Sequence, residues 1–504
     1  MSLQPKSVVI VGGGAAGWIT AAMLVRSWRE ETKITVIESP TVGRVGVGES
    51  TIPSIQTLLR FLGIDEHEFI RRTQATFKCT LHLVGWNDGV TQKDGYHPLF
   101  GWHEERPEVL EEWACCAGDD PASRPDFCDY FLGVQLARHF KSPKREDDGA
   151  HVGAVQYAYH LDAVLMADFL KEWAVQRGVV LVEDNVVAVH RSADGQLASV
   201  QTDANGSFAS DTFFDCTGFR GLLINEALQE RYVSYADDLF CDSAVAIRSY
   251  PDWETRNMAC ETRATALRGG WCWEVPLQTR QGNGYVYSSR ELSQSQAEDE
   301  LLQHLGDVKV SEPRHLKMKV GRVDRAWVKN CLAVGLSAGF VEPLESTSIF
   351  AIQFAVSQYL LGLRASDDEA AERDAFNQTN ADFYDGIRDF IVAHYCLAGR
   401  RDTEFWRENT HRTQLPALLE EVLELWDRGD CLDSFLRNSS SRHLVGPVSW
   451  YCVLTSLNRL PGIVKPPHAS VDRRFQQRVE DAIQSAKSFP DHRQYFASQS
   501  QIFS

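Results

Sequence analysis

Several familiar functional signatures are absent from this chain of 504 residues. It contains no run of about 18 apolar residues, so no membrane-spanning helix is expected. A formal net charge of -18 at pH 7 argues against nucleic acids and anionic membranes as partners, because phosphate groups are bound by basic surfaces. Only residues 1–6 precede the first strand-like run, which leaves no room for a secretory signal. We therefore expect a cytoplasmic protein.

Cysteine and histidine are present, but without the spacings that bind metals. The 12 cysteines include no Cys-x-x-Cys pair, and Cys115-Cys116 is merely vicinal. The 15 histidines include no His-Glu-x-x-His motif. No metal site and no disulfide framework are therefore expected, and reduced thiols fit the cytoplasm.

The chain opens with a strand, a glycine turn and a helix. Ser7–Val11 is short, apolar and β-branched, as buried parallel strands are. Gly12, Gly14 and Gly17 follow in the spacing of a dinucleotide-binding turn, which permits a tight bend, close approach of a pyrophosphate and close packing of the helix. Glu38 ends the second predicted strand, where a carboxylate would hold a ribose hydroxyl. The unit predicts a site for FAD or NAD.

In the rest of the chain, the spacing of apolar residues predicts further helices and strands, and no internal repeat is visible. Helical patterns dominate from about 346 to 488. The other predicted elements are a ligand-contacting loop over 39–55, a helix over 157–177, strands over 179–189, 197–202 and 330–335, and antiparallel strands over 241–290.

Two later turns favour FAD over NAD. The segments 215–218 and 335–339 resemble FAD-contacting turns of flavoprotein monooxygenases, and only one dinucleotide fingerprint is present. We therefore expect an α/β (α+β) fold: a Rossmann-like FAD-binding fold of the flavoprotein monooxygenase type, with an antiparallel β region and an added helical part. The expected FAD-binding module is discontinuous. Its segments are 1–110 and 150–350, with an insertion over 104–150, and the helical substrate-binding region covers 351–504.

The segment Gly270–Pro276 carries Trp271 and Trp273, which face the same way on a strand. A Trp-x-Trp-x-aliphatic-Pro segment downstream of a dinucleotide fingerprint resembles the marker of flavin-dependent halogenases of the tryptophan/indole type. The resemblance covers nearly the whole chain. It is carried also by the segments 46–51, 77–78, 339–347, 388–395 and 402–406.

The resemblance implies a reaction and two catalytic residues. In that family FAD arrives reduced from a separate flavin reductase, by diffusion, and with dioxygen it oxidises chloride or bromide to hypohalous acid. The acid then reaches a lysine beside the bound arene. Matching places this lysine at Lys78, whose pKa would fall if it were buried. Glu345 is the matched carboxylate that would orient the halogenating group and offset the cationic arene intermediate. Glu342 ranks well below Glu345.

The same resemblance assigns binding residues. Residues 39–50 match a mobile strap between the flavin and substrate sites. The halide site is expected at the backbone amides of Thr347 and Ser348. Ser348 replaces the usual glycine of the family, which leaves the choice between chloride and bromide open. The expected cofactor contacts are Gly12, Gly14, Ala15, Ala16, Gly17, Glu38, Gly46, Val47, Gly48, Glu49, Asp215, Gly335, Gly339 and Ser346.

The expected substrate is an electron-rich aromatic molecule. His97 and Phe100 lie where the family places ring-sandwiching residues, with Leu99 as the alternative to Phe100, and Trp450 matches a further substrate residue. Segment 431–449 lacks the polar set that grips free tryptophan in the family. Indole or an indole derivative is therefore favoured over free tryptophan.

Three alternatives stay open at this point: a free-tryptophan halogenase, an FAD-dependent aromatic hydroxylase, and a flavin-binding protein without activity. A homodimer is compatible with the sequence but not indicated by it.

Overall fold

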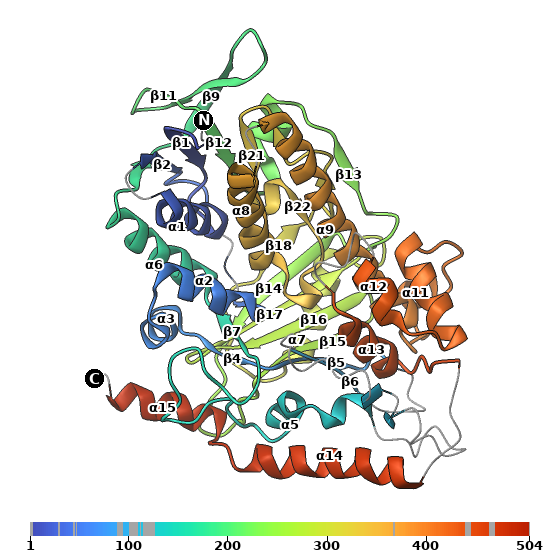
Figure 1. The fold of residues 1–504 in the computed structure, drawn as a ribbon. Coiled ribbons are helices and arrows are strands. Elements are labelled where there is room, and N and C mark those ends of the chain that lie inside the picture. The colour runs from blue at the N-terminus through green and yellow to red at the C-terminus, as the bar shows by residue number, and fades with distance from the viewer. Residues whose placement is uncertain are drawn as a thin grey trace.

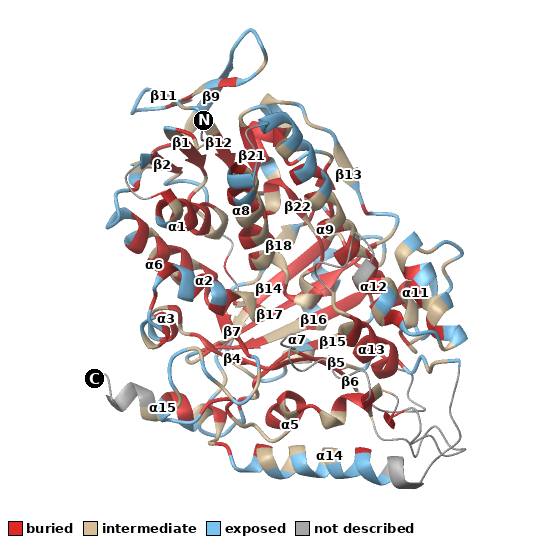
Figure 2. Ribbon diagram, in the orientation of Figure 1, coloured by how far each residue is buried: buried red, intermediate tan, exposed pale blue. Residues whose placement is uncertain are grey.

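The structure is a computed structural model. It describes residues 4–28, 31–43, 46, 48–87, 94–99, 109–110, 112–113, 126–365, 368–438, 445–462 and 469–502. Two large sheets organise the chain, one above the other in Figure 1, and both are formed largely by buried residues (Figure 2).

The upper sheet contains the N-terminal unit and has the strand order β20-β21-β12-β1-β2-β8. Strands β21, β12, β1, β2 and β8 run parallel, and β20 is an antiparallel edge strand. Helices α1, α6 and α8 pack on one another beside this sheet. The bounds are β1 Ser7–Val11, α1 Ala15–Trp28, β2 Lys33–Glu38, α6 Ala163–Val175, β8 Val180–Glu183, β12 Thr212–Asp215, β20 Trp327–Val328, β21 Cys331–Ala333 and α8 Ser348–Ala365.

The lower sheet has seven strands in the order β18-β14-β17-β16-β15-β5-β6. Only the β15–β5 pair is parallel, and the other neighbours are antiparallel. The bounds are β5 Thr80–Val84, β6 Gly95–Pro98, β14 Ser243–Ser249, β15 Glu261–Leu267, β16 Gly270–Pro276, β17 Gln281–Tyr287 and β18 Arg314–Lys317.

Three small sheets complete the β structure, and one of them matters most for the site. In that sheet β7 pairs with both β3 and β4, which brings residue 50 and residue 76 to the same strand. The strands of this sheet are β3 Glu49–Ser50, β4 Thr76–Lys78 and β7 Ala158–Leu161. The second small sheet consists of β9 Val186–Arg191, β10 Leu197–Thr202 and β11 Ser207–Ala209. The third consists of β13 Tyr232–Ser234, β19 Gly321–Val323 and β22 Gly339–Phe340.

The remaining helices surround these sheets; α11, α12 and α13 lie at the right of Figure 1, and α14 and α15 lie along its lower edge. They are α2 Ser54–Leu62, α3 Glu66–Thr73, α5 Leu132–Arg138, α7 Gln294–Leu305, α9 Glu369–Leu397, α10 Glu404–Thr410, α11 Ala417–Arg428, α12 Leu432–Asn438, α13 Pro447–Ser456, α14 Ala469–Lys487 and α15 His492–Ile502. Short turns of helix lie at Phe127–Tyr130, Gly218–Arg220, Leu222–Ala227, Gly335–Ser337 and Pro343–Glu345.

The structure confirms the expected α/β fold class, and it corrects two predicted elements. The predicted helix over 157–177 begins as strand β7, because Asp162 starts α6 by accepting hydrogen bonds from the backbone of Val164 and Leu165. The predicted strand over 179–189 is two strands, β8 and β9. Asp184 lies between them, and its carboxylate accepts hydrogen bonds from Asn205, which bends the chain.

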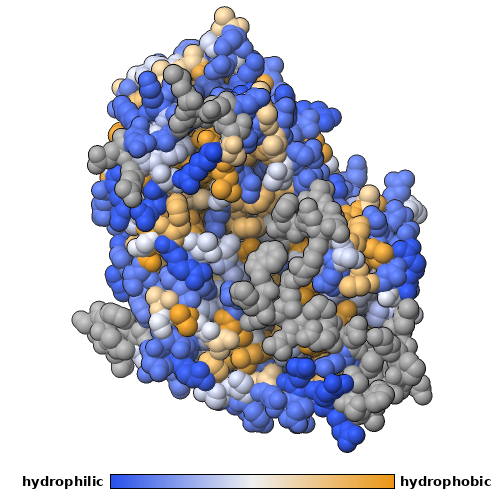
Figure 3. Space-filling model, viewed as in Figure 1, coloured by the Kyte–Doolittle hydropathy of each residue, from blue (hydrophilic) through white to orange (hydrophobic). Residues whose placement is uncertain are grey.

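Figure 3 shows a face that is largely hydrophilic, with apolar residues gathered near its middle. None of the helices in the described part of the chain is long and apolar enough to cross a membrane. The division into a discontinuous module and a helical region stays a prediction.

Candidate active site

The glycine turn after β1 has the geometry that a dinucleotide needs. Gly12 has φ +115°, a conformation that favours glycine, and its N–H donates to the Ile37 carbonyl at 2.9 Å. A Cβ at Gly17 would lie 1.8 Å from the Gly12 oxygen, so only glycine lets α1 start there. Around Gly14 there is open space at the start of α1, where helix N–H groups attract phosphate. These observations fit the pyrophosphate of FAD.

The acidic residues predicted beside the cofactor, Glu38 and Asp215, accept hydrogen bonds from other residues of the protein. Glu38 ends β2 and lies behind Gly13, where its Oε2 accepts a hydrogen bond from Lys171 Nζ at 3.0 Å. Asp215 is fully buried, and its two carboxylate oxygens accept hydrogen bonds from Thr217, Leu223 and Ile224. The Asp215 carboxylate therefore shapes the turn after β12. Its predicted cofactor contact stays a prediction, like that of Glu38.

The turn at residues 335–339 approaches the glycine turn closely. Gly335 has φ +72°, and a Cβ there would lie 2.9 Å from the Cβ of Ala16 in α1. The 335–339 turn is thus packed against the start of α1, as a shared cofactor site requires. Gly339 begins β22, which pairs with β19. The predicted cofactor contacts of Ala15 and Ala16 stay predictions.

The predicted strap enters the space between α6 and β17. Gly46 is buried against Val164, and its carbonyl accepts a hydrogen bond from Arg248 at 3.1 Å. Gly48 has φ +101°, and a Cβ there would lie 3.2 Å from the Cα of Gly282. Val47 lies outside the described residues. Burial raises the pKa of Glu49 to about 7, and the carboxylate of Asp162 adds to this effect.

Lys78 is the last residue of β4, and only 1% of its surface is exposed. Its Nζ donates a hydrogen bond to the Ser346 hydroxyl at 2.8 Å. Burial lowers the pKa of Lys78 to about 8, against the opposing effect of Glu345. The sequence pattern did not settle which way this side chain points, and the structure places it against the turn that carries Ser346 and Glu345.

Glu345 ends the Pro343–Glu345 turn, with its side chain 11% exposed. His97 Nδ1 donates to its Oε2 at 2.8 Å, and His394 Nε2 lies 2.8 Å from its Oε1. Burial acts to raise the pKa of Glu345, but the two imidazoles outweigh it and hold that pKa well below its usual range. Ser346 follows with φ +58°, in the left-handed region. Glu345 is therefore an ionised carboxylate beside Lys78.

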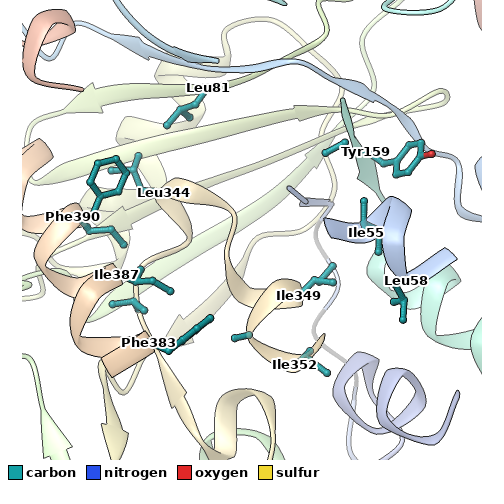
Figure 4. Packing of buried hydrophobic residues seen from close by; sticks show 14 of the residues in the cluster. Ile55, Leu58, Leu81, Tyr159, Leu344, Ile349, Ile352, Phe383, Ile387 and Phe390 are labelled. Carbon is teal, nitrogen blue, oxygen red and sulfur yellow. The ribbon is translucent and has the colours of Figure 1, made fainter. Parts of the chain in front are cut away.

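Aromatic side chains stand on one side of this pair. Phe390 of α9 lies 5.7 Å from the His97 ring and 4.9 Å from the ring of Trp450 in α13. Trp450 is 1% exposed, and Leu99 is half-buried. Phe100 lies outside the described residues, so its predicted contact stays a prediction. Figure 4 shows Phe390, Ile387 and Phe383 along α9, with Leu344 and Leu81 nearby. These side chains are all buried and belong to one apolar cluster.

His394 and Phe390 were missed as site residues by the sequence analysis. They lie four residues apart, on one face of α9. Their signal was a histidine on the apolar stripe of a predicted helix, which is more often a core residue than a functional one. His97 was predicted as a ring-contacting residue, and the structure adds its hydrogen bond to Glu345.

The predicted halide residues lie at the start of α8. Thr347 and Ser348 are both half-buried, and the Thr347 carbonyl accepts the hydrogen bond of Ala351 at 2.8 Å. The first N–H groups of a helix have no partner within it and carry partial positive charge. Their position suits an anion next to Ser346. The halide assignment itself stays a prediction.

Trp271 and Trp273 lie on β16, with ring centroids 6.3 Å apart. Trp271 is 1% exposed, and Trp273 is half-buried over Gly284, where a Cβ would lie 2.1 Å from its ring. The Trp271 indole donates a hydrogen bond to Glu342 at 3.1 Å. The tryptophan segment is therefore connected directly to the turn that carries Glu345. Among the described residues no group of three His, Cys, Asp or Glu side chains could hold a metal.

Fold and site together define an α/β enzyme in which a dinucleotide-type glycine turn accompanies a buried lysine–carboxylate pair. A family model described as tryptophan halogenase matches residues 7–473. The tryptophan 6-halogenase SttH of Streptomyces toxytricini is 36% identical, and the alignment covers 99% of each chain. The tryptophan 7-halogenase RebH of Lentzea aerocolonigenes is 34% identical, with 92% of each chain covered.

Solved structures agree with these relatives. The crystal structure of SttH is similar with a TM-score of 0.88 and 35% identity, covering 98% of this chain and 100% of that one. BrvH, a flavin-dependent halogenase from Brevundimonas sp. BAL3, has a TM-score of 0.86 and 34% identity, covering 98% and 99%. The chain therefore belongs to the tryptophan halogenase family of flavin-dependent halogenases. This confirms the predicted family, fold class and enzyme class.

Proposed function

We propose that this enzyme halogenates the ring of indole or of an indole derivative, with Lys78 presenting the halogen and Glu345 assisting its transfer. One observation carries the proposal: the buried Lys78 is held beside an ionised carboxylate. Lys78 donates a hydrogen bond to Ser346, and Glu345 is the residue directly before Ser346. When bound, reduced FAD together with dioxygen supplies the oxidising power that converts chloride or bromide to hypohalous acid.

Lys78 has two properties that suit this role. Its pKa of about 8 keeps most of the side chain as an ammonium at pH 7, which can donate a hydrogen bond to hypohalous acid and polarise the halogen. The same pKa leaves a minority of free amine that could bind halogen covalently. Its burial at the end of β4 excludes bulk water from the reacting group. Ser346 holds the amine in place through the 2.8 Å hydrogen bond.

Glu345 supplies the negative charge that the reaction needs. Attack of an electron-rich ring on halogen leaves a cationic ring carrying an extra proton, and a nearby carboxylate stabilises that charge and can accept the proton. The histidines at 2.8 Å keep Glu345 ionised and fix its orientation. The wall of His97, Phe390 and Trp450 would hold the ring beside it.

The cofactor and halide residues complete the proposal. The glycine turn of Gly12, Gly14 and Gly17 would hold FAD, and the amides of Thr347 and Ser348 would hold chloride or bromide. A separate flavin reductase, reached by diffusion, would supply the reduced FAD. The single dinucleotide fingerprint in the sequence supports this division of labour.

Indole is the first choice of substrate, and free tryptophan is the second. The hydroxyl of Tyr451 in α13 donates a hydrogen bond to Asp433 in α12 at 2.6 Å, so this tyrosine already has a partner within the protein. The names of the relatives SttH and RebH, which are tryptophan halogenases, favour tryptophan. A comparison of kcat/KM for the two substrates decides, and much faster turnover of tryptophan would contradict the indole preference.

The test of the proposed function is a coupled assay. Purified enzyme is incubated with a flavin reductase, NADH, FAD, indole and either bromide or chloride, and the product is identified by mass spectrometry. We expect halogenated indole that disappears without halide. A hydroxylated product formed without halide would indicate an aromatic hydroxylase, and no product with any indole substrate would favour a flavin-binding protein without activity.

A further inference from the structure

Glu342 is a fully buried carboxyl group that the proposed reaction does not use. It immediately precedes the Pro343–Glu345 turn. Two donors meet at its Oε2: the Tyr395 hydroxyl of α9 at 2.5 Å and the Trp271 indole N–H of β16 at 3.1 Å. The side chain is thus clamped between a helix and a strand that are far apart in the sequence.

The second oxygen of this carboxyl group has no such partner. Among the described residues no atom forms a hydrogen bond with the buried Oε1 of Glu342. An indole N–H can only donate, so Oε2 acts as an acceptor, and a proton on this group would reside on Oε1. Burial raises the pKa of Glu342 to about 7, although Tyr395, Trp271 and Arg412 act to lower it. Burial therefore brings the pKa of this carboxyl group close to neutrality.

Two successive residues of α9 hold the two acids of the turn. His394 lies against Glu345, and Tyr395 bonds to Glu342. The turn between these acids also places Ser346, the hydrogen-bond partner of Lys78. A displacement of Glu342 would therefore be transmitted through one short turn to both groups that contact the proposed reacting halogen.

We propose that Glu342 is a positioning residue for halogen transfer, a buried neutral acid whose clamp by Trp271 and Tyr395 fixes the turn that carries Glu345 and Ser346. This inference rests on the proposed function. It gives the tryptophan segment of β16 a structural reason to accompany the catalytic turn, because one of its two indoles is a member of the clamp.

The groups around Glu342 leave it as the one that changes charge near neutral pH. Burial raises the pKa of Tyr395 well above its usual value, and the pKa of Cys241, whose sulfur lies 3.6 Å from the Tyr395 hydroxyl, is raised likewise. Both stay protonated. Arg412 is the nearby cation that acts on Glu342 from the segment after α10. Ionised Glu342 would add a second negative charge to the turn, so halogen transfer should decline as the pH rises through about 7.

Two substitutions of Glu342 distinguish the effect of its hydrogen bonds from the effect of its negative charge. Glu342→Gln keeps a neutral, similarly shaped group with an acceptor for both donors, whereas Glu342→Leu leaves the Trp271 and Tyr395 donors buried without a partner. We expect the glutamine variant to keep the wild-type kcat at pH 6 and to lose the part of the decline centred near pH 7, leaving the later decline expected as Lys78 loses its proton near pH 8. We expect the leucine variant to lose kcat on the order of tenfold, with little change in KM for the aromatic substrate.

Asp389→Asn provides the matched control. Asp389 is also a buried acid of α9, and burial raises its pKa to about 6, opposed by Arg388. Its substitution should leave the decline near pH 7 in place. Tyr395→Phe serves as the second variant if the leucine protein fails to fold: it removes one donor, and the midpoint of the decline should move to higher pH.

The protonated acid can also be observed without turnover, by infrared difference spectroscopy of the carboxyl carbonyl stretch. A band that disappears with a midpoint near pH 7 and is absent from Glu342→Gln would support the inference. The inference is overturned if wild type halogenates and Glu342→Leu matches it in kcat and pH profile, or if Glu342→Gln is as impaired as Glu342→Leu. Failure of wild type to halogenate would instead overturn the proposed function.

Discussion

Glu342 and Glu345 stand three residues apart in the sequence, yet the side chains that surround their carboxyl groups differ. Glu345 has an imidazole on each side, and its pKa is held low. Glu342 has a phenol, an indole and a thiol nearby, and its pKa rises to about 7. Burial acts in the same direction on both, so the partners decide which of them is ionised. From the sequence, Glu342 ranks well below Glu345 as a catalytic residue, and no residue pattern indicates that the two acids differ in charge.

The largest loss of activity should come from a substitution of Lys78, the lysine that lies beside Glu345. Lys78→Met removes the amine and should lower the rate of halogenated product by at least about 100-fold, because no other group presents the halogen. The measurement is product formation by mass spectrometry, with FAD binding as the check that the protein is folded.

Lys319→Met is the control for this change. Partial burial also lowers the pKa of Lys319, but this lysine is an exposed residue and lies over Tyr232. It should halogenate like wild type. An equal loss of halogenated product in both variants would show that the effect does not depend on the amine of Lys78.

The next effect distinguishes the two acids directly. Glu345→Gln removes the charge that faces the arene, and we expect kcat to fall roughly 10- to 100-fold with KM for indole unchanged. Glu342→Gln should stay within a few-fold of wild type at pH 6. The comparison fails if the two glutamine variants lose kcat to the same extent.

Stability measured against pH sharpens the comparison further. The folded pKa of Glu342 lies above the usual 4.5, so its contribution to stability is present below pH 4.5 and is lost as the pH rises to about 7. Glu342→Gln lacks this loss. Relative to wild type, its free energy of unfolding should gain on the order of 3 kcal/mol between pH 4.5 and 7.5.

The sign reverses at Glu345. Its folded pKa is lowered, so its contribution is present above pH 4.5 and is lost as the pH falls below that value. Glu345→Gln should therefore lose stability relative to wild type at neutral pH but not in acid. Urea unfolding at several pH values checks both signs, and parallel curves for the two variants would contradict the assigned charges.

The smallest effect concerns the two tryptophans of β16. Trp271→Phe removes the indole donor to Glu342 and should reduce kcat by a few-fold, because a single neutral hydrogen bond is worth about 1 kcal/mol. Trp273→Phe removes only packing over Gly284 and should have less effect. Steady-state kinetics of the pair measures the difference, and a larger loss for Trp273→Phe would assign the tryptophan segment another role.

The local elements were predictable where one short segment carries the whole signal. The spacing of Gly12, Gly14 and Gly17 after an apolar strand predicted β1, α1 and β2 close to their observed bounds. The predicted helix over 157–177 was wrong only at its start, because residues 158–161 form β7 and pair with β3 and β4, and such pairing leaves no local periodicity.

The site was predictable only in part. Lys78 and Glu345 followed from resemblance, and the structure brings both to Ser346, although their roles stay a proposal. The link from Trp271 through Glu342 to Tyr395 joins a strand, a turn and a helix. No spacing within one segment could reveal it, because it depends on how the lower sheet packs against α9. The direction of the Lys78 side chain likewise depends on a contact between distant segments, its hydrogen bond to Ser346.

The most direct test of the central claim is the halide dependence of the wild-type product. With reductase, NADH, FAD and indole, bromide should give bromoindole with the two-isotope pattern of bromine, and chloride should give chloroindole. Omission of halide should abolish both. An oxygenated indole formed equally with and without halide would contradict the account.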